Sequence, residues 1–180
     1  NINFTTSVFL NSLKDLVAEV PGTYDGRNAL IKTNIGEALL YGFEYSIDFK
    51  IMNQLSVYNT LSYVRGLNQM DNQDLPQISP LNGIAGIEYS PFDWMITDFY
   101  TIFFSDQVKV APDEKTTAGY ATFNLKLSVT NLNIAGVRPG ISIGFENIFD
   151  KDYRNHLSTN RGFIVSEPGR NIFIRVSLAF

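Results

Sequence analysis

The C-terminal twelve residues, from Gly169 to Phe180, most strongly limit what this chain can fold into. Every second residue from Ile172 onward is apolar, and the residues between them are polar, small or aromatic. Alternation over this length predicts a β-strand with one apolar face and one more polar face. Such a strand left at a free sheet edge would invite aggregation, and closure into a barrel removes the edge. In a membrane barrel the apolar face points outward to lipid.

Seven further segments are expected strands, and six of them show the same period of two. The clearest covers residues 39–51 and is longer than the about 5–6 residues of a typical soluble strand. Roughly 9–11 residues cross a bilayer as a tilted strand, so this segment is long enough to span a membrane. The segment 94–104 is apolar on both faces, so its periodicity does not decide which face points outward. The other strands are expected at about 2–11, 55–66, 81–89, 121–129 and 141–146.

The connections between these strands alternate in length, which is the rhythm of an all-β, antiparallel up-and-down transmembrane β-barrel. A lysine or arginine that faced mid-bilayer lipid would cost about 2–4 kcal/mol, so we expect the polar face to point into the lumen. The long connections are expected at 12–33, 67–80, 105–119 and 150–168, and the shorter ones at 52–54, 90–93 and 130–139. The expected lumen-facing or plug-facing residues are Glu44, Asp48, Glu88, Lys126, Glu146 and Arg175.

The composition agrees with a membrane sheet and excludes some partners. Charged residues make up 18% of the chain, below the roughly 25% of soluble domains, and aromatic residues reach 13%. The net charge is −4 and no basic patch is present, so we expect no nucleic-acid partner. There is no cysteine, which excludes disulfides and thiolate metal sites.

No set of residues predicts catalysis, a cofactor or a metal site. Nothing places Glu44, Glu88 and Glu146 at one reacting group, and no phosphate loop, nucleophile elbow or metalloprotease helix is present. His156 is the only histidine and has no carboxylate or thiolate at ligand spacing, so a role in loop packing is favoured over ligand contact. The candidates for substrate contact in the loops are Tyr24, Asp25, Arg27, His156 and Arg161, although Asp25-Gly26 equally marks a plain turn.

Three segments together resemble the C-terminal part of TonB-dependent outer-membrane receptors. Ala38-Leu-Leu-Tyr-Gly-Phe-Glu44 resembles the Gly-x-Glu strand of that family, and Leu75-Pro-Gln-Ile-Ser-Pro-Leu81 is similar to its proline-containing lead-in to a strand. The most specific segment is Gly144-Phe-Glu-Asn-Ile-Phe-Asp-Lys-Asp-Tyr-Arg-Asn-His-Leu-Ser158. It is followed by Glu167-Pro-Gly-Arg-Asn171 and the terminal Phe180. The resemblance covers about residues 30–180.

The resemblance implies a 22-strand barrel with an N-terminal plug, in the outer membrane of a Gram-negative bacterium. Residues 1–180 would be its C-terminal segment, without the plug and the earlier strands. The implied activity is active import of a ferric siderophore, haem, cobalamin or other metal complex. The implied partners are TonB (through the missing N-terminal part), the plug, the earlier strands, the small nutrient and the lipid bilayer. Phe180 would be a signal for the barrel assembly machinery.

The sequence also leaves one alternative open. A self-contained eight-strand outer-membrane barrel with a structural or adhesion role would have a small interior filled by its own side chains.

Overall fold

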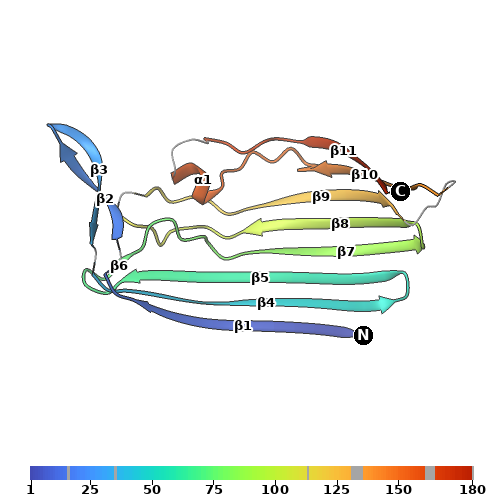
Figure 1. Cartoon of the computed structure of the whole chain (residues 1–180), viewed down its shortest axis with the longest axis horizontal. Helices are drawn as coiled ribbons and strands as arrows, with labels where there is room; N and C mark the ends of the chain where they lie inside the picture. The colour runs from blue at the N-terminus through green and yellow to red at the C-terminus, as the bar shows by residue number, and fades with distance from the viewer. Residues whose placement is uncertain (16, 35, 113, 131–135, 161–164, 180) are drawn as a thin grey trace.

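Eight long antiparallel strands form one sheet (Figure 1). The structure is a computed structural model and describes residues 1–15, 17–34, 36–112, 114–130, 136–160 and 165–179. The strands lie side by side in the order β1 (Ile2–Leu13), β4 (Ala38–Met52), β5 (Leu55–Asn68), β7 (Asn82–Phe92), β8 (Met95–Phe104), β9 (Tyr120–Val129), β10 (Arg138–Glu146) and β11 (Asn171–Ala179). All eight expected strands are confirmed.

Four short elements lie at one end of this sheet, opposite the end that holds the N-terminus (Figure 1). They are β2 (Val17–Tyr24) and β3 (Arg27–Asn34), which form a separate hairpin, β6 (Gln73–Asp74), which pairs with β5, and α1 (His156–Asn160). Asp25 and Gly26 both have positive φ, at 50° and 73°, as a type I′ hairpin turn requires. The sequence indicated a plain loop for the first long connection. The structure instead forms a β-hairpin within it. We call this end of the sheet the long-loop end.

No helix among the described residues is long and apolar enough to cross a membrane.

The strand register gathers the charged residues on one face, which we call the polar face. Asp98 of β8 pairs directly with Glu88 on one side and Lys126 on the other, so the register orients β8 where periodicity did not. Side-chain hydrogen bonds also reach across this face, such as Tyr58 Oη of β5 donating to Asp98 Oδ1 of β8 at 2.8 Å, past the intervening β7. The same register places all six residues predicted to face the lumen on the polar face: Glu44, Asp48, Glu88, Lys126, Glu146 and Arg175.

The opposite face is apolar and exposed, and we call it the apolar face. Phe4, Phe99 and Ile174 on this face are 61%, 42% and 68% exposed. Within the described strands of the sheet, Arg65 and Asp74 are the charged residues there, and they lie at the long-loop end, where Arg65 Nη2 is 3.2 Å from Asp74 Oδ1. Soluble monomers rarely leave so large an apolar surface uncovered. The face therefore suits contact with lipid.

The sheet is open, with β1 at one edge and β11 at the other. Among the described residues no strand ladder joins these two edges. Eight strands that closed on themselves would need such a ladder. The open sheet is the form expected of part of a larger barrel, and it does not support the self-contained alternative.

Aromatic rings cover several glycines of the polar face, and this contact yields a prediction about stability. The ring of Tyr58 lies where a Cβ atom on Gly86 would stand. We expect Gly86→Val to displace Tyr58, break its hydrogen bond to Asp98 and lower barrel stability by about 1–3 kcal/mol. Urea unfolding of the whole receptor in lipid vesicles measures this change.

Ala85→Val is the matched control, because Ala85 lines an open groove of about 540 Å³ on the apolar face. Its unfolding midpoint should stay close to that of the unmodified receptor. Equal losses of stability in Gly86→Val and Ala85→Val would contradict the predicted role of the contact between Tyr58 and Gly86.

Candidate functional site

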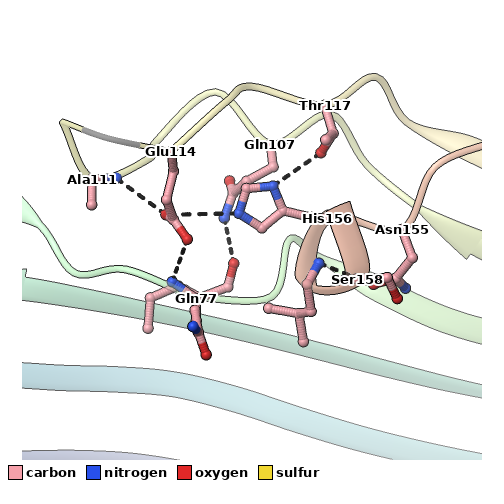
Figure 2. Close-up of polar contacts among 10 residues, drawn as sticks. Gln77, Gln107, Ala111, Glu114, Thr117, Asn155, His156 and Ser158 are labelled. Atoms are coloured by element: carbon pink, nitrogen blue, oxygen red, sulfur yellow. Dashed lines mark hydrogen bonds and ion pairs between the residues drawn. The ribbon is translucent and has the colours of Figure 1, made fainter. Parts of the chain in front are cut away.

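A buried histidine joins the long connections at the long-loop end (Figure 2). His156 is the first residue of α1 and is only 2% exposed. Its Nδ1 lies 3.1 Å from Thr117 Oγ1, and its Nε2 lies 3.9 Å from Glu114 Oε2. Thr117 and Glu114 belong to the connection between β8 and β9, so the histidine ties the last long connection to the one before it.

Glu114 extends the same cluster to a third connection (Figure 2). Its Oε1 accepts a hydrogen bond from the Gln77 backbone N–H at 2.6 Å, and its Oε2 accepts one from Ala111 at 3.3 Å. Gln107 Nε2 donates to the Ile78 carbonyl at 2.8 Å. Three loops far apart in the sequence are therefore joined through a few buried polar side chains, which we call the His156 cluster.

Burial lowers the pKa of His156, and the Glu114 carboxylate raises it and offsets part of that effect. The folded state thus holds the imidazole neutral. A histidine with a depressed folded pKa stabilises the fold above its unfolded pKa of about 6.5, and this stability is lost as pH falls through the lower folded value.

We therefore expect the His156 cluster to loosen on acidification. Amide hydrogen exchange in residues 105–112 and 156–160, corrected for intrinsic rates, should be several-fold faster at pH 5 than at pH 7.5, because protonation favours the open loops. The variant His156→Gln should lose this pH dependence. Exchange that is independent of pH in the unmodified receptor would contradict the prediction.

The turn after β10 is held by one buried asparagine. Asn147 is 4% exposed and has a positive φ of 49°. Its backbone N–H donates to Asn124 Oδ1 at 3.0 Å, and its side chain exchanges hydrogen bonds with the Lys151 backbone at 2.8 and 2.9 Å. Its Nδ2 also donates to the Pro168 carbonyl at 3.4 Å. Asn147 belongs to the segment 144–158, which most resembles the receptor family. Its side chain thus connects the start of the last long connection to Pro168 near the end of that connection.

A pocket of about 320 Å³ lies between the β8–β9 connection and the segment after β10. The rings of Phe104 and Tyr120 stack with their centroids 5.0 Å apart, and the ring of Tyr153 lies 4.3 Å from that of Tyr120 and is tilted by 36° against it. Tyr120 belongs to the polar face, since it pairs with Phe104, which in turn pairs with Asn82. The charged residues that line this tyrosine pocket are Lys115, Lys151, Asp152 and Arg154. Sequence reasoning missed the pocket because no local pattern joins residues some thirty positions apart.

The sequence-predicted loop candidates do not meet at one place. Tyr24, Asp25 and Arg27 form the tip of the β2–β3 hairpin, where Tyr24 is 78% exposed. His156 is buried in its cluster, so a ligand would reach it only if the loops opened. Arg161 and Phe180 lie outside the described residues. Contact of these residues with a ligand stays a prediction. In the described parts of the chain, no group of three or more histidine, cysteine or acidic side chains is placed to hold a metal.

An antiparallel sheet with one lipid-compatible face, one charged face and its long connections at one end defines the wall of a transmembrane β-barrel. A family model described as TonB dependent receptor-like, beta-barrel matches residues 1–148, and the chain belongs to this family. Receptors of this family lie in the outer membrane of Gram-negative bacteria and are not enzymes. The resemblance noted in the sequence is thereby confirmed.

Solved structures share the fold over almost the whole chain. A copper transporter, OprC, is 24% identical with a TM-score of 0.85, over 97% of this chain and 28% of its own. The iron transporter FrpB from Neisseria meningitidis is 14% identical with a TM-score of 0.72, over 97% and 28%. The ferric citrate transporter FecA is 18% identical with a TM-score of 0.71, over 96% and 28%. The chain thus spans about 28% of the length of these proteins. No curated protein matches the sequence.

Proposed function

We propose that residues 1–180 are the C-terminal barrel segment of a TonB-dependent importer for a scarce metal complex. The observation that carries the proposal is the open eight-strand sheet, whose free edges β1 and β11 leave room for further strands. Its match to 28% of a copper transporter supports the same interpretation. Earlier strands would close the barrel, and an N-terminal plug would fill it.

Each face and end of the sheet has a role in this proposal. The apolar face contacts the bilayer, because it carries almost no charge. The polar face, with Glu44, Asp48, Glu88, Lys126, Glu146 and Arg175, contacts the plug. The long-loop end is extracellular and helps to select the ligand, with the β2–β3 hairpin and the His156 cluster among its parts. TonB acts through the N-terminal part of the receptor, and Phe180 serves as the signal for barrel assembly.

The transporters that share the fold support the proposed class of cargo. Those three proteins are transporters named for copper, iron and ferric citrate. A ferric siderophore, haem, cobalamin or another metal complex is therefore the class that we assign to this receptor.

Uptake into cells tests the proposal. Cells that carry the whole receptor should accumulate at least one radiolabelled complex from a panel of these classes. That uptake should disappear when TonB is deleted or when the proton-motive force is dissipated. Uptake that persists without TonB, or that does not differ between receptor-deleted and complemented cells for any complex, would refute the proposal.

A further inference from the structure

We propose that the apolar face holds one phosphate-bearing lipid in a fixed position, with its headgroup at Arg65 and an acyl chain in a groove at the centre of the bilayer. The inference rests on the proposed contact of this face with lipid and is independent of the cargo. Two observations carry it: an apolar groove across the middle of the face, and a cationic pocket at its long-loop end. The distance between the two sites supports a single ligand.

The groove has a volume of about 540 Å³, and short side chains make room for it. The register places Asn59, Ala85 and Thr101 next to one another on three neighbouring strands. The polar atoms of Asn59 are used within the protein, since its Oδ1 accepts from Tyr45 Oη and its Nδ2 donates to the Ile84 carbonyl. The Thr101 hydroxyl oxygen is buried and is not accessible from the groove. An apolar chain therefore fits the groove, whose larger lining residues are Ile47, Phe49, Val57, Ile87, Phe99 and Phe123.

The groove lies midway between two rows of aromatic residues on the apolar face. On β5, Tyr63 belongs to the row at the long-loop end, and Leu55 is paired with Tyr89 of the row at the opposite end. Asn59 lies four positions from Tyr63 and four from Leu55. Aromatic girdles flank the apolar band of membrane barrels at both interfaces. The groove is therefore close to the bilayer midplane, where acyl chains surround the protein.

A smaller pocket of about 150 Å³ lies at the long-loop end of the same strands, and we call it the Arg65 pocket. Arg65 is paired with Tyr41 and follows Tyr63 by two positions, which puts it at the level of the lipid headgroups. Its Nη2 lies 3.2 Å from Asp74 Oδ1, but neither Arg65 Nε nor Asp74 Oδ1 makes a hydrogen bond. Lys109 also lines the pocket, and no carboxylate of the described residues lies within 4.0 Å of its ammonium.

The carboxylates of the Arg65 pocket are already engaged by the protein. Asp74 faces Arg65, and Asp106 Oδ1 accepts a hydrogen bond from the Gly119 backbone N–H at 2.5 Å. The groups left to bind a ligand are therefore donors of Arg65 and Lys109. A guanidinium binds phosphate through paired, charge-assisted hydrogen bonds, and an ammonium adds a second positive charge. The pocket thus favours the phosphate group of a lipid.

The spacing of the two sites matches the length of one lipid. Arg65 and Asn59 are six positions apart on β5, which corresponds to about 20 Å at roughly 3.4 Å per residue. A strand tilt of about 35–45° reduces this distance to a depth of roughly 14–17 Å. Half of a hydrocarbon core of about 30 Å is about 15 Å. An acyl chain along the membrane normal crosses the tilted strands, and it still meets the groove because the groove extends from Ile47 of β4 to Phe123 of β9.

Lipid binding to the purified whole receptor in detergent tests the inference, with native mass spectrometry as the readout. The probe is dioleoyl phosphatidic acid, which carries a phosphomonoester and two long chains. Dioleoyl phosphatidylcholine has the same chains without the net negative charge, and dihexanoyl phosphatidic acid has the same headgroup on short chains. We expect one molecule of the probe to bind per receptor, with a Kd at least tenfold lower than that of either comparison lipid.

Two variants address the two ends of the lipid. Lys109→Gln should raise the Kd of the probe by about fivefold or more, because a charge-assisted contact with the phosphate is lost. Ala85→Phe should raise it by a similar factor by filling the groove, and should leave the weak binding of the short-chain lipid unchanged. Lys151→Gln is the matched control, since it removes one positive charge from the lining of the tyrosine pocket and not from the Arg65 pocket. Its Kd for the probe should equal that of the unmodified receptor.

Several results would overturn the inference. Equal Kd values for the probe and either comparison lipid would show that the headgroup or the chain is not recognised. An unchanged Kd in Lys109→Gln or in Ala85→Phe would remove that end of the site. Full competition by inorganic phosphate would assign the Arg65 pocket to a free anion. Loss of TonB-dependent uptake would refute the import function alone, because the lipid assay contains neither cargo nor TonB.

Discussion

A lysine in place of Phe99 is expected to prevent stable insertion of the receptor, whereas a lysine in place of Ile102 on the same strand is expected to be tolerated. The register puts Phe99 in the middle of β8 on the apolar face and Ile102 on the polar face. A lysine facing lipid near the midplane costs about 2–4 kcal/mol, and one facing a lumen costs far less. Urea titration in lipid vesicles, together with the heat-dependent gel mobility of folded barrels, measures both variants.

This pair of variants also tests the orientation of β8, which the sequence alone left open. Both substitutions replace an apolar side chain of β8 by lysine. The added charge and the strand propensity of the new residue are therefore the same in the two variants. Tolerance of Phe99→Lys together with failure of Ile102→Lys would mean that the faces have been assigned the wrong way round.

Removal of the Asn147 side chain is expected to open the long-loop end. The variant Asn147→Ala leaves the Lys151 N–H, the Lys151 carbonyl and the Pro168 carbonyl without their side-chain partner. Each buried polar group that loses its partner costs about 1–3 kcal/mol. The positive φ of 49° adds roughly 1 kcal/mol for alanine, which tolerates that conformation poorly. Limited proteolysis should then cut the segment after β10 much faster than in the unmodified receptor.

The variant Asn147→Gly separates the effect of the lost hydrogen bonds from the effect of backbone strain. Glycine adopts the positive φ without strain but loses the same hydrogen bonds. The proteolysis rate of Asn147→Gly should therefore lie between those of the unmodified receptor and Asn147→Ala. Proteolysis rates that are the same in all three proteins would show that this asparagine does not hold the last loop.

The alternation of apolar residues predicted seven of the eight long strands because barrel strands obey a strict period of two. Residues 39–51 illustrate this, since β4 covers Ala38–Met52 with the expected faces. Long-range pairing did not follow from the sequence. The orientation of β8 depends on its pairing with both neighbours, which places Asp98 between Glu88 and Lys126.

The β2–β3 hairpin was missed for a physical reason. Asp25-Gly26 is a strong turn signal, but Pro21 and Gly22 in the preceding run weaken any strand prediction. The His156 cluster and the tyrosine pocket were missed because they join side chains from separate loops. His156 contacts Thr117, 39 residues earlier, and no periodicity reports such a contact.

Single spin labels along β9 report whether alternate residues of this sheet face lipid and lumen. The chain has no cysteine, so each introduced cysteine is unique within it. In the whole receptor in lipid, labels at Phe123, Leu125 and Leu127 should be accessible to oxygen dissolved in the bilayer. Labels at Thr122, Lys126 and Ser128 should instead be accessible to a water-soluble nickel complex. A reversed pattern, or accessibility without a period of two, would contradict the account.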